Sequence, residues 1–408
     1  MAVEILAVDK GPLFDDSITH FEYHTHAPYA STRYGNNDEI RIPVHQQDVF
    51  TLPTESFLYI EGKLTKKDGT EGEPNVKLVN NAMAFLFEEI RYELAGVEVD
   101  RTKNVGITTT MKNLLSINER DIIPLNNACW TTEDTLSLVS PKGEFNFCLP
   151  LKMLMGFAED YKRIVMNVKQ ELILLRSSTD LNALVKTDDQ AANGVLEIQK
   201  IYWKIPYVHV ANVYRLALLD VLNKDRALTM AFRSWELYEY PLLPQTTRQT
   251  WTVKTSSQLE RPRYVILAFQ TGRKNDISTH AEQFDHCKLT NVRLFLNDKY
   301  YPYDNLNLDI VNGRFALLYD MYARFQHTYY NRHNVDPVLS PTQFQSKAPL
   351  YVIDCSRQDE SLKSSSVDVR LEFEASESFP ANTTAFCLIL HDSIVEYKPL
   401  SNTVRRIS

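Results

Sequence analysis

The residues with the best spacing for metal chemistry are histidines near the amino terminus. His24 and His26 are two positions apart, so on a β-strand their imidazoles lie on one face, and His20 is close by. A bicupin-type metal enzyme needs two such histidines, an acidic residue shortly after them, and a third histidine on a later strand. No glutamate follows His26 until Glu39. We therefore expect a solvated segment in which any metal binding is adventitious.

Other side chains that perform catalysis in enzymes lack the necessary arrangement here. Glu88-Glu89 and Asp188-Asp189 are sequence neighbours, and strand neighbours point to opposite faces, so neither forms a glycosidase pair. His391-Asp392 stands in a late predicted strand without a matched pair. Other histidines lie in predicted loops without ligand spacing: His280, His286, His327 and His333. There is no G-x-S-x-G, P-loop or GxGxxG motif. We predict no catalytic, cofactor-binding or metal-binding residue, and no enzyme.

The composition is that of an ordinary globular chain rich in aromatic residues. Its 408 residues are 44% hydrophobic and 24% charged, with 21 Tyr, 19 Phe and only 12 Gly. Scarce Gly disfavours phosphate-binding loops, whereas many aromatics suit β-rich cores and subunit contacts. The net charge of −8 divides into −9 for residues 1–204 and +1 for residues 205–408. Neither half has the basic character that indicates nucleic-acid binding.

Cysteine use and the chain start indicate a protein made in the cytosol. The five cysteines form no CxxC pair and are odd in number, so we expect reduced, mostly buried thiols: Cys129, Cys148, Cys287, Cys355 and Cys387. We see no signal peptide and no run of about 18 apolar residues that could span a membrane. The basic pair Arg405-Arg406 is too short to indicate a partner.

Alternating patterns dominate the chain. Residues 40–44, 250–254 and 367–374 alternate apolar and polar side chains, which is typical of strands with one buried face. Two runs, 57–60 and 264–267, are apolar on both faces and predict central strands. Helical spacing occurs in only three places, within 107–115, 213–222 and 315–322. These patterns predict an all-β protein with short inserted helices, not a parallel α/β sheet.

A faint internal repeat organises these elements. Residues 90–96 precede a predicted helix at 107–117, and residues 292–298 precede one at 313–325. The offset between Arg91 and Arg293 is about half the chain length. The same order of events continues outside these segments, with predicted strands at 57–60 and 264–267, strand starts at Leu149-Pro150-Leu151 and Pro349-Leu350, and strands at 168–175 and 367–373, then 195–203 and 385–395. We predict that the chain contains two copies of one β-unit; the alternative is chance similarity of two β-rich halves.

The repeat predicts two tandem eight-stranded antiparallel jelly-roll sandwiches. We place them at residues 38–206 and 224–400, joined by a connector helix at 207–223. Residues 1–37 have no clean period, so we assign them to an amino-terminal arm outside both units, and 401–408 to a tail. The longest polar loop of the first unit is 61–77, and 326–348 is the irregular stretch of the second.

This arrangement resembles the double jelly-roll major capsid proteins of the lineage that includes adenovirus hexon, virophages, adintoviruses and Polinton-type elements. Residues 232–244, which read FRSWELYEYPLLP, are similar to a segment of hexon-like proteins from insect viruses and virus-derived insect genes. The resemblance extends from about residue 38 to 400. It depends on the character and order of segments, without a catalytic signature.

The resemblance implies a homotrimer with a pseudo-hexameric outline that tiles an icosahedral shell, and a virion location. It also implies a separate single jelly-roll penton protein as a partner. The arm would lie beneath the shell or reach a neighbour, and the compact chain implies short towers. Aromatic clusters such as Tyr300-Tyr301-Pro302-Tyr303 suit subunit contacts, although packing in the core or a loop is the alternative.

Three other functions remain open on the sequence. The first is a virus-derived host protein that keeps the fold without forming a shell. The second is the bicupin-like metal enzyme. The third is a carbohydrate-binding or other adhesive jelly roll, against which the absence of a visible signal peptide argues. Metal content and size in solution distinguish the enzyme from the capsid protein.

Overall fold

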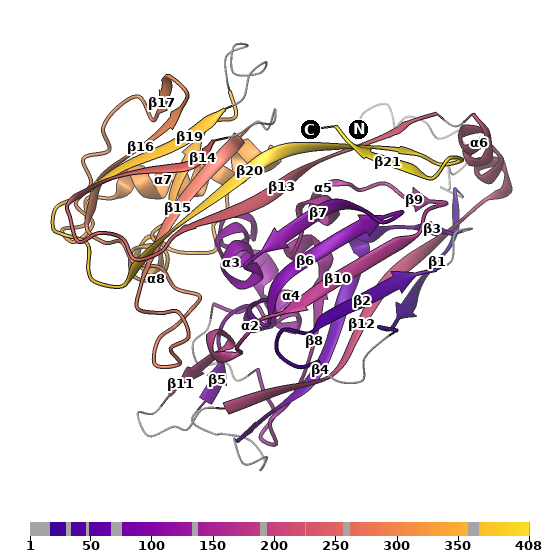
Figure 1. Cartoon of the computed structure of the whole chain (residues 1–408), viewed down its shortest axis with the longest axis horizontal. Helices are drawn as coiled ribbons and strands as arrows, with labels where there is room; N and C mark the ends of the chain where they lie inside the picture. Colours follow the sequence, from indigo (N-terminus) through magenta and orange to yellow (C-terminus); the bar gives the residue numbers. More distant parts are fainter. Residues whose placement is uncertain are drawn as a thin grey trace, which may run out of the picture.

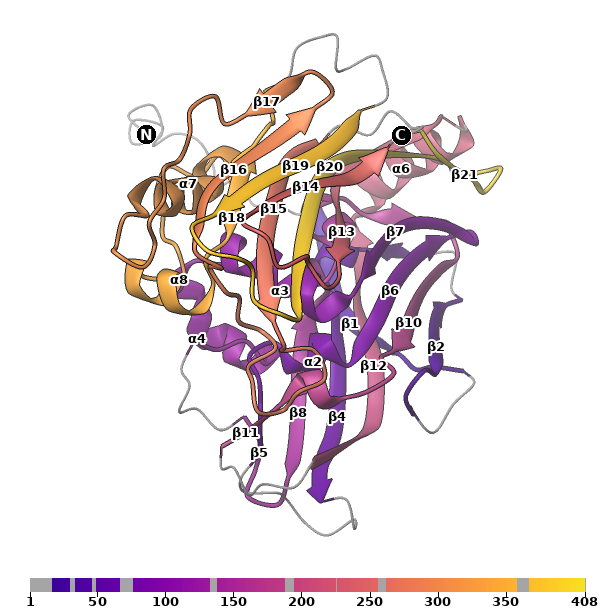
Figure 2. The same cartoon turned by 60° about the vertical axis from the view of Figure 1, so that its left-hand side comes forward.

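The computed structural model describes residues 17–29, 34–45, 49–66, 76–132, 138–187, 194–224, 226–255, 262–357 and 367–407. Asp188-Asp189 and most of the predicted loop 61–77 lie outside these residues. Within the described part, strands predominate and pair antiparallel (Figures 1 and 2). No described helix is long and apolar enough to cross a bilayer.

The first sandwich consists of two sheets that face each other. One has the order β1-β12-β4-β8, with strands β1 (Ile18–His26), β12 (Gly194–Val210), β4 (Phe57–Lys66) and β8 (Glu144–Pro150). The other has the order β2-β10-β6-β7, with strands β2 (Glu39–Val44), β10 (Gln170–Arg176), β6 (Phe87–Leu94) and β7 (Val97–Lys103). Four short strands accompany them: β3 (Phe50–Thr51), β9 (Val165–Met166), β5 (Val76–Leu78) and β11 (Leu184–Lys186).

The second sandwich is built in the same way. One sheet has the order β13-β20-β15-β18, with strands β13 (Leu228–Tyr240), β20 (Thr383–Lys398), β15 (Pro262–Thr271) and β18 (Tyr351–Asp354). The other has the order β14-β19-β16-β17, with strands β14 (Arg248–Thr255), β19 (Asp368–Ala375), β16 (Leu289–Leu296) and β17 (Lys299–Tyr301). A last strand, β21 (Thr403–Arg406), pairs with the end of β20.

The two sandwiches share one topology. When the eight main strands of each are numbered by position along the chain, both read 1-8-3-6 in one sheet and 2-7-4-5 in the other. This is the jelly-roll order, in which two Greek keys close a double sheet. The duplication and the double jelly-roll fold predicted from the sequence are therefore confirmed.

Helices occupy the connections. The predicted repeat helices are α3 (Val105–Ser116) and α7 (Ala316–Tyr330), and each lies between the fifth and sixth strands of its sandwich. The predicted connector helix is α6 (Asn212–Asn223), which has no buried residue. The shorter helices are α2 (Ala82–Phe85), α4 (Ile122–Leu125), α5 (Gly156–Asp160) and α8 (Pro341–Lys347). Single 3-10 turns lie at Pro53–Glu55, Glu119–Asp121, Asn126–Ala128, Leu151–Met153 and Leu181–Ala183.

Alternation fixes which side chains enter the cores. In β19, Val369, Leu371 and Phe373 are buried while Asp368 and Arg370 point to solvent. Since successive strand residues face opposite sides, one sequence pattern supplies both the core and the wet face. Each core also contains packed aromatic rings, with Tyr92 against Trp203 in the first sandwich and Phe269 against Phe373 in the second.

The observed strands correct four expectations from the sequence. Residues 18–26 do not lie apart in an arm, because β1 pairs along the edge of β12 and supplies the first strand of the first sandwich. The tail is also paired, through β21. Leu149-Pro150-Leu151 marks the end of β8 instead of a strand start, and β12 continues past Pro206 to Val210. The partner of β1 is distant in sequence, so local pattern gave no indication of that pairing, whereas β21 forms a local hairpin with the end of β20.

Candidate functional site

The feature that joins the two sandwiches is a buried junction between β13 and the first sandwich. Strand β13 lies against α5 and β7 (Figure 1). The approach is so close that a Cβ atom added at Gly156 would lie 1.9 Å from the Arg233 carbonyl oxygen. Beside it, the rings of Phe157 and Phe232 meet edge to face at 5.2 Å. Glycine is therefore required at the start of α5 by space, and two apolar rings close the contact.

An arginine from the second sandwich anchors this contact. Arg233 donates from Nε to Asp160 Oδ2 at 2.7 Å and from Nη2 to Oδ1 at 2.5 Å. Its backbone N–H also donates to Oδ2 at 2.9 Å. The guanidinium lies 3.5 Å from the ring centroid of Tyr329, whose carbonyl oxygen it also binds. Such two-pronged, stacked contacts fix orientation as well as adding attraction.

A fully buried lysine stands at the centre of the junction. Lys112, on α3, donates from Nζ to Glu159 Oε1 at 2.9 Å, to Ser116 Oγ at 2.7 Å and to Tyr330 Oη at 2.7 Å. Nζ also lies 4.7 Å from the ring centroid of Trp235. Burial lowers the pKa of Lys112, while the Glu159 carboxylate opposes that shift. Both sandwiches thus supply the groups that surround the Lys112 ammonium, and three acceptors match its three N–H donors.

A buried carboxyl lies at the edge of the same junction. Asp100, on β7, accepts the backbone N–H of Phe157 at Oδ2 (2.8 Å) and that of Arg101 at Oδ1 (2.9 Å). Burial raises the pKa of Asp100 to about 6, although both backbone donors oppose the shift. It borders a cavity of about 530 Å³. A raised carboxyl pKa in a cavity is a feature of some active sites, so the neighbouring groups decide its meaning.

Those neighbours do not form a catalytic set. Ser234 Oγ lies 3.2 Å from His391 Nε2, and Glu236 Oε2 lies 3.7 Å from the same nitrogen. A nucleophile activated by a histidine needs the acid on the opposite ring nitrogen, where it orients the ring. Here Ser234 Oγ lies almost equally far from both ring nitrogens, 3.2 Å from Nε2 and 3.3 Å from Nδ1, so it is aligned with the lone pair of neither. Side chains from adjacent strands therefore produce a resemblance to a triad without its geometry.

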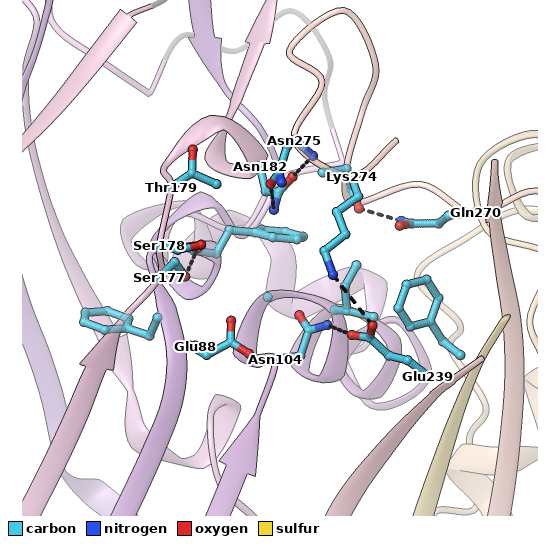
Figure 3. Close-up of a pocket in the computed structure, with 16 residues that line it drawn as sticks. Glu88, Asn104, Ser177, Ser178, Thr179, Asn182, Glu239, Gln270, Lys274 and Asn275 are labelled. Carbon is cyan, nitrogen blue, oxygen red and sulfur yellow. Dashed lines mark hydrogen bonds and ion pairs between the residues drawn. The ribbon is translucent and has the colours of Figure 1, made fainter. Parts of the chain in front are cut away.

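A second cavity, of about 300 Å³, separates the sandwiches near α2 and α3 (Figure 3). Its polar groups bind one another across the junction: Asn104 and Lys274 both point to Glu239, and Asn182 and Asn275 exchange hydrogen bonds. It contains no nucleophile beside a base. This cavity is therefore part of the polar interface between the two sandwiches.

The amino-terminal histidines lie on β1, where their side chains contact Glu22 and Tyr207. His24 and His26 share the inward face, as their spacing predicts, and the His24 ring stacks on Tyr207 at 3.9 Å. The sequence reasoning missed Glu22, which binds His20 Nε2 at 3.0 Å and His24 Nε2 at 2.8 Å. The alternation His-x-Glu-x-His, taken as a strand, would have indicated it. Hydrogen bonds to His24 and His20 lower the pKa of Glu22 to about 2.

The other candidate residues stay apart. Glu89 pairs with Arg91, while Glu88 borders the cavity of Figure 3. Among described residues, no group of three or more His, Cys, Asp or Glu side chains has the geometry to hold a metal ion. All five cysteines are free thiols, and burial raises the pKa of Cys129 and Cys287 to about 12.

Comparisons with known proteins show which family and which solved structures this chain is similar to. The family described as a double jelly roll-like domain matches residues 76–395. Similar solved structures include the PBCV-1 virus capsid, with TM-score 0.63, 10% identity and coverage of 98% of this chain and 99% of that one. The mavirus major capsid protein has a TM-score of 0.60 and 10% identity, with coverage of 98% of this chain and 92% of that one. The Faustovirus major capsid protein has a TM-score of 0.57 and 9% identity, with coverage of 95% of this chain and 92% of that one. At these identities the likeness shows a shared fold. No curated protein has a significant sequence match. Since the family match spans most of the chain and both sandwiches repeat one strand order, the chain belongs to the double jelly roll-like domain family.

Proposed function

We propose that this chain is a viral major capsid protein, without enzymatic activity, whose working unit is a homotrimer with a pseudo-hexameric outline. The observation that carries the proposal is the duplicated sandwich held by the Lys112 and Arg233 contacts. A capsid subunit must keep its two sandwiches at a fixed angle to each other, because any error in that angle is repeated by each of the three subunits in the trimer. The buried ion pairs and the close approach at Gly156 supply that rigidity.

The similar structures support this role. Their printed descriptions are of viral capsids and major capsid proteins, and each is matched over nearly its full length. By analogy of fold, we propose that trimers tile an icosahedral shell, that a single jelly-roll protein fills the vertices, and that the chain resides in the virion.

Sizing and electron microscopy of the purified full chain test the proposal. We expect a species of three times the 47.1 kDa chain mass with a hexagonal outline, and particles where assembly conditions permit. Trimers that never form particles would favour the virus-derived host protein. A monomer that retains a bound metal after dialysis would overturn the proposal and favour the bicupin-like enzyme.

A further inference from the structure

The connector helix α6 lacks the packing that usually stabilises a helix of its length. None of its twelve residues is buried, and no side chain caps its amino-terminal end. Asp220 pairs with Lys224 at 2.5 Å, but that ion pair is exposed and adds little. A helix of about 12 residues is marginal in water by itself, because most helical stability comes from packing of an apolar face. The leucine-rich sequence of α6 therefore indicates that a further segment covers it.

An apolar groove of about 420 Å³ lies between α6 and the first sandwich, at the outer edge of the molecule (Figure 1). The side chains that line it are mainly apolar and come from α6, β12 and the segment around β3: Val49, Phe50, Tyr207, Val210, Leu219 and Leu222. Arg215 also lines the groove, and within the described residues its guanidinium has no ion-pair partner. Apolar walls beside an unpaired cation suit an occupant that carries both apolar and acidic side chains.

The described part of the chain begins beside this groove. The backbone oxygen of Ser17 accepts the N–H of Ala211 at 3.0 Å, and Ala211 is the residue before α6. The sixteen residues that precede Ser17 lie outside the described part, and they are attached to the chain at this point. An extended chain of that length reaches roughly 50 Å, whereas α6 is only about 18 Å long. Residues 1–16 are therefore long enough to follow the whole helix.

The chemistry of residues 1–16 matches the groove. They contain four acidic residues and one lysine, so their charge is opposite to that of Arg215. The acidic pair Asp15-Asp16 directly precedes Ser17, and the apolar pair Leu13-Phe14 comes before it. Leu219 lies about 12 Å along α6 from its start, a distance that an extended chain covers in roughly four residues. The acidic pair is thus within reach of Arg215, and the apolar pair is within reach of Leu219.

We infer that residues 1–16 dock in the groove between α6 and β12 of the same chain, with Leu13-Phe14 against its apolar walls and Asp15-Asp16 beside Arg215. A segment tethered so close to its site has a high effective concentration there, so a few contacts are sufficient to hold it. The docked segment gives α6 the apolar cover that the described residues do not provide. Because the contact lies within one chain, the inference does not depend on the proposed capsid function.

Cysteine pairs in the full chain test the contact directly. Phe14→Cys/Leu219→Cys places one thiol on the segment and one in the groove. Phe14→Cys/Val213→Cys is the matched control, because Val213 is on the same helix, is 77% exposed and does not line the groove. A disulfide requires Cα atoms within about 7 Å of each other. After mild oxidation, peptide mass spectrometry identifies the joined positions, and non-reducing electrophoresis shows whether they belong to one chain.

We expect positions 14 and 219 to join within one chain, and the control pair to oxidise at least about ten times more slowly. Equal rates in the two pairs would overturn the inference. A bond between two chains, at twice the chain mass, would also overturn it, since the occupant of the groove would then be a second copy.

Hydrogen exchange of the α6 amides gives an independent measurement without new cysteines. Phe14→Asp should speed exchange across α6 by at least about tenfold, whereas Ile123→Asp, at an 81% exposed position on α4, should leave it unchanged. Arg215→Glu should also speed exchange, and adding Asp16→Arg to it should recover part of the protection. Circular dichroism verifies that each variant is folded. Exchange in α6 that is as fast in the wild type as in Phe14→Asp would show that the segment does not cover the helix and would sink the inference.

Discussion

Replacing Lys112 with methionine is the sharpest perturbation of the junction. Methionine keeps most of the side-chain length and removes the charge, leaving Glu159 with only Tyr330 and solvent as partners. Removing one member of a buried ion pair typically costs 3–5 kcal/mol. Lys112 is fully buried but the Glu159 side chain is 14% exposed, so we expect the low end, about 3 kcal/mol.

The paired variant Lys112→Met/Glu159→Gln separates the charge effect from packing. Glutamine still accepts the Tyr330 hydroxyl, and no charge remains unpaired, so the double variant should lose only about 1 kcal/mol. The double variant should therefore be about 2 kcal/mol more stable than Lys112→Met alone, so the two single effects should not add. Lys224→Met is the control, since Lys224 pairs with Asp220 at an exposed site and should cost under about 0.5 kcal/mol.

Urea unfolding followed by tryptophan fluorescence measures these differences, because Trp235 lies beside Lys112. For a cooperative unit of about 200 residues, 3 kcal/mol corresponds to a fall in Tm of about 6–12 °C. All variants must be compared at one protein concentration, since assembly also stabilises the fold. A Lys112→Met protein as stable as the Lys224→Met control, or single effects that simply add, would refute the reasoning.

Three further outcomes are expected from the same structure. Because the pKa of Asp100 is raised, the Asp100 carboxyl stays protonated to higher pH in the folded chain than in the unfolded chain. The protonated carboxyl therefore contributes to the free energy of unfolding below about pH 4, and that contribution is lost by about pH 6. The stability of Asp100→Asn relative to the wild type should therefore rise by about 3 kcal/mol between pH 4 and 7, measured by urea unfolding at each pH; a constant difference would contradict this. Gly156→Ala should destabilise the junction by at least about 1–3 kcal/mol, because its Cβ overlaps the Arg233 carbonyl oxygen, and an unchanged Tm would show that this approach can relax. A reducing agent should leave the Tm unchanged, and alkylation of the native protein followed by mass spectrometry should leave the buried thiols unmodified: Cys129, Cys355 and Cys387.

Much of the fold could be predicted because jelly-roll strands carry a local signal. Alternation identified β2, β14 and β19, and helical spacing identified α3 and α7. The faint repeat around Arg91 and Arg293 was sufficient to predict the duplication, since both residues lie on the fourth strand of their sandwich. These signals are short-range, and burial of one strand face imposes them on the sequence.

Strand β1 escaped prediction for a physical reason. Its inward face carries histidines and a glutamate, so the usual contrast between apolar and polar faces is reversed. Polar residues are stable there because they bind one another and Tyr207, as Glu22 and His26 do. Only the exposed edge of β12 shows that this segment is a strand.

By itself, the sequence determined the class of fold, the duplication and the absence of recognisable catalytic motifs, because these follow from patterns within a few tens of residues. The junction was decided by tertiary structure alone. Lys112, Glu159 and Tyr330 come from three separate elements, and Arg233 meets Asp160 across the boundary between sandwiches. Ion pairs form where folding brings charges together, and no local spacing encodes contacts between segments that far apart in the chain.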